Sequence, residues 1–312
     1  LREGYKMKIM VFDVGGTEIK YSVMDEQMHR TDSGAVPTPQ DTQAQFLDAV
    51  YRLYAPHKDE VSGIAMALPG FVDNRTGYVS NGGALLYNTA TPVGQLLAEK
   101  CGCPVILEND GKAAAMAELA NGALKDCCNA AVFIIGTGVG GGIIANGQLV
   151  RGVHFTAGEY SFVNTNAEAW DAPDQNMACQ CSTSNLLKWY RARKALPEDA
   201  PLDGRSFFAA ANAGEPEALE VLRRFCHAVA VQIYNLTVLL DVEKVAIGGG
   251  ISKQPLLLES LRSAYNGLYA SRAGQAYMEG LPRCQIVPCA FSSEANQVGV
   301  AAAYFEAMQK KR

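Results

Sequence analysis

The chain has 312 residues, about twice the length of a common domain, so two domains are expected. Hydrophobic residues make up 48% and charged residues 19%, which excludes a mostly disordered protein, and no apolar run reaches the roughly 20 residues that span a bilayer. The net charge is −5 and the sole basic cluster is Lys310-Lys311-Arg312, so the electrostatic pattern of a nucleic-acid-binding protein is missing.

The first predicted element is a β-hairpin. The apolar run Lys8 to Val14 leads into Gly15-Gly16, and apolar alternation resumes from Ile19 to Val23, which leaves little room for a helix. Asp13 and Thr17 flank the glycines, so a carboxylate, a hydroxyl and bare backbone N–H groups meet in one turn. A plain turn needs neither polar side chain. The pattern therefore predicts a site for nucleotide phosphates and their magnesium ion.

Two further strands and a helix follow. Residues 62–68 and 105–107 are strand candidates, and residues 112–121 have helical spacing. This alternation predicts the α/β class. The segment Glu108-Asn109-Asp110 lies between the second strand and the helix. Asp110 is interpreted either as a helix cap or as a rigidly held general base for phosphoryl transfer, and spacing alone favours the cap.

A second hairpin is predicted further along the chain. Ala130 to Ile135 runs into Gly136 to Gly142, and Ile143-Ile144-Ala145 continues to an Asn146-Gly147 turn. Its similarity to the first hairpin predicts a duplicated fold with a second phosphate turn. The same glycines match the dinucleotide fingerprint of an oxidoreductase, with Glu159 downstream, but that fingerprint has to open a helix and here a strand follows.

The remaining elements complete two lobes. Residues 215–240 have long helical periodicity, residues 245–247 form a strand that meets Gly248-Gly249-Gly250, and residues 297–308 form a closing helix. We place the lobe boundary near residues 115–125. The predicted domains are residues 7–118 with the first phosphate hairpin, residues 119–294 with the second, and residues 295–312 as the closing helix, for which a return to the first lobe is an open alternative.

Together these motifs resemble those of the ROK sugar kinases, within the hexokinase and actin-like ATPase superfamily. The resemblance covers nearly the whole chain, and its motifs keep the family's order: Asp13-Val14-Gly15-Gly16-Thr17 with Lys20, Pro69-Gly70-Phe71-Val72-Asp73 with Asn81, Glu108-Asn109-Asp110, Gly136 to Gly142, Ala157-Gly158-Glu159, and Gly248-Gly249-Gly250. It implies a two-lobed, actin-like (ribonuclease H-like) fold with an inter-lobe cleft, ATP and Mg²⁺ as cofactors, and a homodimer or homotetramer.

The resemblance also implies roles for individual residues. Asp110 is expected to be the general base that acts on the 6-hydroxyl of a sugar. The residues expected to hold the other sugar hydroxyls are Gly70, Asn81, Asn109 and Glu159. Asp13 is expected to help place magnesium, and the residues expected to bind ATP are Gly15, Gly16, Thr17, Lys20, Gly136, Thr137, Gly138, Gly140, Gly249 and Gly250.

The chain departs from the family where most members hold a structural zinc ion. The usual histidine position is Phe162, and the usual C-x-C-G-x-x-G-C segment reads Cys179-Gln180-Cys181-Ser182-Thr183-Ser184-Asn185-Leu186. Two of the four ligands are therefore missing, so no zinc is expected unless residues such as His154 or Asp174 substitute.

The sugar pocket departs from the family as well. Lys188 stands where a second sugar-contacting glutamate is usual, and Phe162 offers an aromatic face to a pyranose ring or to a group attached to it. These changes resemble the zinc-free branch that includes β-glucoside kinases, which accept a substituent at the anomeric carbon. Glucose, N-acetylmannosamine or another hexose is an alternative substrate.

Two other classes of function fit the motifs less well. A ROK transcriptional repressor would carry a winged helix before the first motif, and 12 residues before Asp13 are too few for one. A non-catalytic sugar sensor would not need the base Asp110 or both phosphate turns. The chain has nine cysteines without a regular spacing, which indicates free thiols in a reducing compartment and predicts a cytoplasmic protein.

Overall fold

The computed structural model describes residues 7–309, which divide into two compact units. The first unit contains residues 7–120, 151–157 and 293–309, and the second contains residues 121–150 and 158–292. The closing helix thus belongs to the first unit. So do residues 151–157, which lie inside the sequence range assigned above to the second lobe.

The first unit is built on a five-stranded sheet in the order β3-β2-β1-β4-β7. The β1–β2 and β2–β3 pairs are antiparallel and the β1–β4 and β4–β7 pairs are parallel, so the first predicted hairpin is confirmed. A separate two-stranded sheet pairs β5 with β6. The bounds are β1 (Lys8–Val14), β2 (Glu18–Asp25), β3 (Arg30–Pro37), β4 (Ile64–Leu68), β5 (Phe71–Asp73), β6 (Tyr78–Asn81) and β7 (Val105–Asn109).

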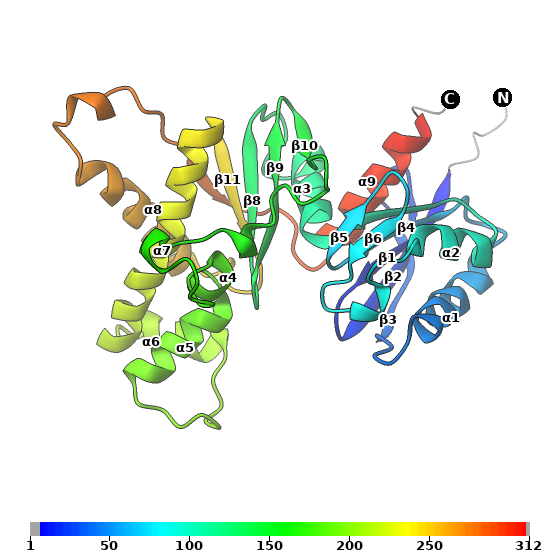
Figure 1. Cartoon of the computed structure of the whole chain (residues 1–312), viewed down its shortest axis with the longest axis horizontal. Coiled ribbons are helices and arrows are strands. Elements are labelled where there is room, and N and C mark those ends of the chain that lie inside the picture. Colours follow the sequence, from blue (N-terminus) through cyan, green and yellow to red (C-terminus); the bar gives the residue numbers. More distant parts are fainter. Residues whose placement is uncertain (1–6, 310–312) are drawn as a thin grey trace. The chain divides into compact units, whose positions relative to one another are not determined.

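Helices cover both faces of this sheet (Figure 1). Alternate residues of β1, such as Met10 and Phe12, share a buried cluster with Phe46 of α1 and Leu97 of α2. The helix α9 packs on β1 and β4 and passes so close to α3 that a Cβ atom on Gly299 would lie 1.7 Å from the Ala113 carbonyl oxygen. The bounds are α1 (Gln43–Tyr54), α2 (Val93–Cys101), α3 (Asp110–Asn121) and α9 (Ala295–Gln309).

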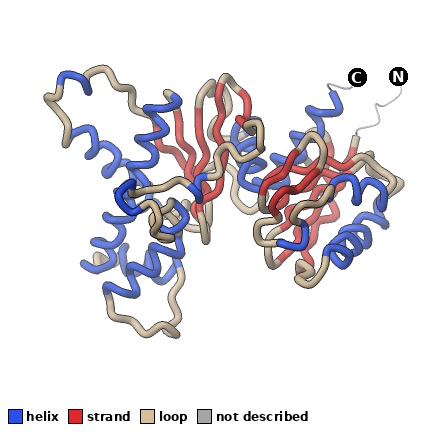
Figure 2. The backbone as a smooth tube through the Cα atoms, in the orientation of Figure 1, coloured by secondary structure: helices blue, strands red, loops and turns tan. Residues whose placement is uncertain are grey.

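The second unit repeats this sheet topology in the order β10-β9-β8-β11-β12 (Figure 2). Its β8–β9 pair is an antiparallel hairpin, and β11 pairs in parallel with β8 and β12. After Gly141 the chain continues as a strand, so the dinucleotide-binding interpretation is wrong. The bounds are β8 (Ala130–Ile135), β9 (Val139–Ala145), β10 (Gln148–Val150), β11 (Lys244–Gly248) and β12 (Gln285–Pro288).

The core of the second unit lies between this sheet and its helices. Buried side chains of α7, including Phe225 and Val229, share one cluster with Phe133 of β8 and Ile247 of β11. The helix α7 starts with a proline in its first turn, where the missing N–H costs nothing. The bounds are α4 (Met177–Gln180), α5 (Thr183–Arg193), α6 (Gly204–Asn212), α7 (Pro216–Leu240) and α8 (Pro255–Ala270).

The cysteines and the helices bear on two expectations from composition. All nine cysteines are free thiols, as predicted. Within residues 7–309, every helix is too short or too polar to cross a membrane.

Candidate active site

The first glycine turn joins β1 to β2 and carries Asp13 near the end of β1. Asp13 lies opposite Lys20 in the strand register, and its Oδ1 accepts a 2.9 Å hydrogen bond from Nδ2 of Asn296. Burial raises the pKa of Asp13, and the Asn296 amide and the Lys20 charge oppose that rise. Carboxylate oxygens are the ligands that magnesium prefers, so the donor set at this turn suits Mg²⁺.

Side chains from the loop after β3 hold the same turn in shape. Thr38 donates from Oγ1 to the Gly15 carbonyl at 2.8 Å, and Gln40 donates from Nε2 to the Gly16 carbonyl at 2.7 Å. Because the Thr38 and Gln40 side chains bond these two carbonyl oxygens, the shape of the turn does not depend on its own backbone hydrogen bonds alone. Neither supporting residue was predicted, because they lie in a loop with no periodic pattern.

The segment Glu108-Asn109-Asp110 ends β7 and begins α3. The Oδ1 atom of Asn109 accepts the backbone N–H of Lys112 at 3.0 Å, which is the bond a helix cap makes. The capping role considered for Asp110 therefore belongs to its neighbour. Asp110 is half-buried in the first turn of α3, where its Oδ1 accepts the Gly111 N–H at 2.7 Å.

Three of the predicted sugar-binding residues lie together in the first unit. Asn109 donates from Nδ2 to the Gly70 carbonyl oxygen at 2.9 Å. Gly70 has a φ of +92°, and a Cβ atom there would lie 2.0 Å from the Asn81 carbonyl oxygen, so this position requires glycine. Asn81 is exposed and accepts the Gly83 N–H at 2.8 Å. The polar groups of these loops are thereby set at the C-terminal ends of β4 and β7.

The second glycine turn joins β8 to β9 in the second unit. The Gly136 N–H donates to the Gly138 carbonyl at 3.0 Å, and the Ser161 hydroxyl bonds both the N–H and the carbonyl of Val139. The adjacent Tyr160 donates from its hydroxyl to the Gly142 carbonyl at 3.1 Å. Both side chains follow the half-buried Glu159, so the glutamate is anchored to the hairpin through its own neighbours.

A cavity of about 520 Å³ opens beside this turn, within the size range of small-molecule sites. It brings together Gly136 and Thr137 of the second turn with Gly250 of the third glycine cluster, as the sequence predicted for one ligand. The lining also includes polar and apolar residues that the sequence analysis missed: Thr183, Ser184, Leu187, Asp203, Gly204, Arg205, Ile251 and Gln254. A cavity of this kind can hold a nucleotide, with its phosphates at the glycine turn.

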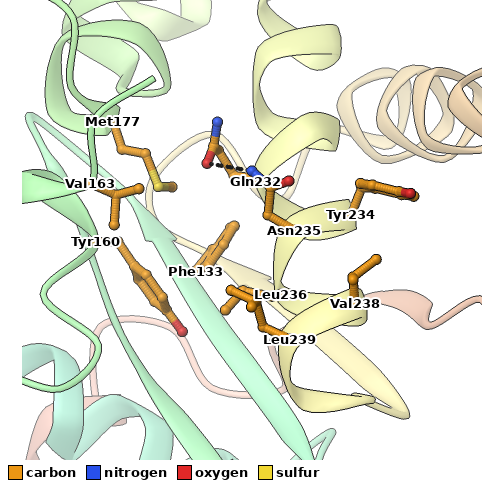
Figure 3. Close-up of a pocket in the computed structure, with 10 residues that line it drawn as sticks. All are labelled: Phe133, Tyr160, Val163, Met177, Gln232, Tyr234, Asn235, Leu236, Val238 and Leu239. Carbon is orange, nitrogen blue, oxygen red and sulfur yellow. Dashed lines mark hydrogen bonds between the residues drawn. The ribbon is translucent and has the colours of Figure 1, made fainter. Parts of the chain in front are cut away.

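The residues directly after Glu159 are mostly apolar or aromatic: Tyr160, Phe162 and Val163, with the polar Ser161 between them. Phe162 is 70% exposed. Its neighbours in the chain, Tyr160 and Val163, help to line a pocket of about 340 Å³ among β8, α4 and α7, where the rings of Phe133 and Tyr160 pack edge to face (Figure 3). Its few polar groups include the Asn235 amide, which donates to Gln232 at 3.4 Å. Because sugars need many hydrogen-bond partners, we do not assign the sugar to this pocket.

The cysteine segment has the environment of ordinary thiols. Cys181 is buried, and burial raises its pKa to about 12, so it keeps its proton. Cys179 lies in α4, whose cap is the Asn176 side chain. In residues 7–309, the ligand atoms of Asp32, His57 and Glu60 are the one such group of three close enough to share an ion, on the surface of the first unit. The absence of structural zinc remains a prediction.

Comparisons with known proteins agree with the geometry. The ROK family model matches residues 9–309. A beta-glucoside kinase from Listeria innocua is 31% identical over 258 residues, which is 82% of this chain and 87% of that protein. A ROK family protein from Streptococcus pneumoniae, solved in complex with sucrose, has a TM-score of 0.85 at 28% identity and covers 97% of this chain and 100% of its own. A ROK family glucokinase from Streptomyces griseus, solved with glucose and AMPPNP, has a TM-score of 0.77 at 25% identity, with 95% and 98% covered.

Proposed function

This chain belongs to the ROK family and is an ATP-dependent sugar kinase, and we propose that it phosphorylates the 6-hydroxyl of a hexose or β-glucoside with Asp110 as general base. The observation that carries the proposal is the junction of β7 and α3. There, Asn109 provides the helix cap, and Asp110 stands next to it, half-buried in the first turn of α3. A carboxylate that the Gly111 N–H holds in one orientation is suited to accept a proton.

In this mechanism the first unit holds the sugar. Gly70, Asn81 and Asn109 bind its hydroxyl groups, and Glu159 of the second unit binds a further one. Asp110 accepts the proton of the 6-hydroxyl as that oxygen attacks the γ-phosphorus of ATP, the bond from this phosphorus to the β–γ bridging oxygen breaks, and ADP leaves. The Gly111 N–H stays bonded to Oδ1 and keeps the carboxylate in one orientation during the transfer.

The glycine turns hold the phosphoryl donor. We assign Asp13 to the magnesium ion, and the ATP to the following residues: Gly15, Gly16, Thr17, Lys20, Gly136, Thr137, Gly138, Gly140, Gly249 and Gly250. When bound, ATP supplies the electrophilic phosphoryl group, and its magnesium ion offsets the negative charge of the phosphate oxygens. The exposed Thr17 hydroxyl and the Lys20 ammonium contribute hydrogen bonds and positive charge from the first unit.

For the sugar we favour a glucoside with a group on its anomeric carbon. Phe162 exposes an aromatic face three residues beyond Glu159, where a hydrophilic histidine is usual in the family. Aromatic faces bind the apolar faces of sugars and of aryl groups. The beta-glucoside kinase and the complex with sucrose, a disaccharide, both involve sugars with a substituted anomeric carbon. The alternative is an unsubstituted hexose or N-acetylmannosamine.

We further propose that the chain forms a homodimer or homotetramer and works in the cytoplasm, where its nine thiols remain reduced. Size-exclusion chromatography with light scattering measures the assembly directly. A monomeric mass at micromolar concentration would contradict it.

The proposed function is tested by ADP release with Mg-ATP against glucose, mannose, N-acetylmannosamine, N-acetylglucosamine, fructose, cellobiose and an aryl β-glucoside. The matched control is Asp110→Asn, whose amide oxygen can still accept the Gly111 N–H. Sugar-dependent turnover that the control loses supports the kinase and identifies its substrate. Sugar binding by calorimetry without turnover in the wild type would instead support the non-catalytic sensor.

A further inference from the structure

Residues 151–157 form a strap between two parts of the second unit's sequence. They follow β10 and precede Gly158, yet they belong to the first unit. The next residue after that glycine is Glu159. The strap is therefore the covalent link between the second phosphate hairpin and the proposed sugar-binding glutamate, and its own contacts lie on the first unit.

The side chains of Arg151 and Phe155 fix the strap there, and Arg151 also donates from Nη2 to Sδ of Met116 at 3.4 Å. Arg151 donates from Nε to Oε2 of Glu108 at 2.8 Å. Phe155 is buried, and the Arg75 guanidinium lies 4.6 Å from the centre of its ring. The Ala157 N–H donates to the Arg151 carbonyl at 3.2 Å, so the strap is also bonded to itself. Phe155 has a φ of +60°, which is uncommon for a bulky residue and has to be held by such packing.

Glu108, which accepts the hydrogen bond from Arg151, is fully buried. Its side chain has no exposed surface, whereas that of Arg151 is 27% exposed. Its Oε1 accepts the backbone N–H of Asn109 at 3.1 Å, and its Oε2 accepts from Asn74 at 3.4 Å as well as from the strap. One carboxylate thus joins the strap to the peptide that carries Asn109 and leads to Asp110.

The electrostatics of this carboxylate depend on the strap. Burial raises the pKa of Glu108, and the charges of Arg151 and Lys112 oppose the rise. These two cations face it from the strap and from α3, and the polar Asn74 faces it from the turn between β5 and β6. A buried ion pair is weak evidence for stability, because desolvation offsets much of its attraction. Its hydrogen bonds do, however, fix the direction of the groups that share it.

Building on the proposed kinase function, we infer that Arg151 is a positioning residue: through Glu108 it orients the peptide that presents Asn109 and Asp110 to the sugar. At its start the strap holds Glu108, which bonds the Asn109 peptide, and after its end the chain passes through Gly158 to Glu159.

The first test is the turnover of Arg151→Met. A misplacement of a catalytic group by about 1 Å can lower turnover about 100-fold, so we expect kcat to fall about 10- to 100-fold. The KM for ATP should stay within about twofold, because the hydrogen-bond partners of the pair, Asn74, Asn109 and Met116, lie outside the ATP turns. Arg151→Lys restores the charge without the planar fork and should recover part of the loss. The matched control is Arg193→Met, which removes an ion pair of the same 2.8 Å length from a half-exposed site and should leave kcat within about twofold.

The second test separates positioning from a merely structural role. Without Arg151, Glu108 takes up a proton at higher pH, and its protonated oxygen no longer holds the same partners. The kcat of Arg151→Met should therefore decline further as pH falls from 8 to 6, in excess of the wild-type decline. Glu108→Gln in the same chain removes the titrating group and the buried charge that has lost Arg151. The double variant should lose this extra pH dependence and unfold at a higher temperature than Arg151→Met.

Wild-type and Asp110→Asn turnover are measured alongside. If the wild type is active and Arg151→Met keeps its kcat and its pH profile, the inference is overturned and the proposed function stands. If the wild type shows no sugar-dependent turnover, the proposed function fails and the inference falls with it. If Arg151→Met does not fold, the double variant decides: kcat near wild type would overturn the inference, and a loss of at least about tenfold supports it.

Discussion

The two five-stranded sheets have the same order of antiparallel and parallel neighbours, but different residues stand at equivalent points of their hairpins. In the first hairpin, Asp13 pairs with Lys20 across the strands, two residues before the first turn glycine. In the second, the equivalent position pairs Ile134 with Gly140. One copy of the motif has charged groups and the other has apolar and bare backbone groups.

The difference shows how one topology yields two kinds of site. A carboxylate–lysine pair at a glycine turn can bind a cation and phosphate oxygens with side chains. A turn with glycines on both sides instead offers its backbone N–H groups, which phosphate oxygens can approach closely because no side chain stands in the way. The first unit also places Asp110 after its last strand, where the second unit places Cys289 after β12. Acid–base chemistry is therefore expected from the first unit and nucleotide binding chiefly from the second.

Among variants that test this difference between the two units, the largest effect on activity is expected from substituting Asp110. General bases contribute about 10² to 10⁴ in rate, so Asp110→Asn should lower kcat about 10³-fold in an ADP-release assay. Sugar affinity measured by calorimetry should change little, because proton transfer belongs to the transition state. Turnover within about tenfold of the wild type would remove Asp110 from the mechanism.

The second effect is on stability, at a glycine of the second hairpin. Gly141 has a φ of +145°, and a Cβ atom there would lie 1.8 Å from the Val132 carbonyl oxygen. Gly141→Ala should therefore lower the free energy of unfolding by about 3 kcal/mol in urea titrations. Gly147→Ala is the control, since its φ of +70° is also positive but a Cβ atom there would meet nothing within 4 Å. Equal losses in the two variants would show that the collision is relieved.

Substitution of Asp13 is expected to raise the stability of the protein and to lower its activity. Burial raises its pKa, so the folded state binds the proton more tightly than the unfolded chain does. Stability conferred by this group therefore falls as pH rises through the window between the ordinary pKa of about 3.9 and the raised value. Asp13→Asn should raise the melting temperature at pH 7 by an amount that disappears below pH 4. Its Mg-ATP-dependent kcat should fall about 10- to 100-fold.

The Asp13 prediction has a simple control. Melting curves of wild type and Asp13→Asn are compared at pH 4 and pH 7 without nucleotide. A variant that is less stable at pH 7 would contradict the sign derived from burial. A variant with unchanged magnesium dependence would assign the cation to other residues.

The smallest effect is expected at Phe162. Aromatic contacts contribute about 0.5 to 1.5 kcal/mol, so Phe162→Ala should raise the KM for an aryl β-glucoside about 2- to 10-fold. The KM for glucose should change less, since glucose lacks the attached ring. Trp170→Ala is the matched control, because that ring is 73% exposed on the same unit. An equal change for both substrates would place the aromatic face against the pyranose itself.

Local patterns predicted a large part of the fold. The strand alternations around both glycine turns became β1–β2 and β8–β9, and the periodicity of residues 215–240 became α7. These features depend on neighbours in sequence, which is why they could be read directly. The position of Asp110 at a strand–helix junction was also predicted from neighbouring residues. The residue that caps α3, however, is Asn109.

Several residues around the site could not be found in this way. Asn296 bonds Asp13 across 283 positions, Thr38 bonds Gly15 from a loop, and Arg151 reaches Glu108 across 43 positions. Each lies where no period or motif marks it. Which distant polar group meets which depends on how the helices and loops pack on the sheets.

The sequence by itself determined the α/β class, the two glycine hairpins and the family. Backbone preferences, hydrophobic periods and glycine spacing act over a few residues, so the amino acids alone specify them. Only the tertiary structure decided that Asn296 and Arg151 join the first unit and that Asn109, rather than Asp110, caps α3. Buried polar groups must find hydrogen-bond partners, and those partners exist only once distant segments are packed together.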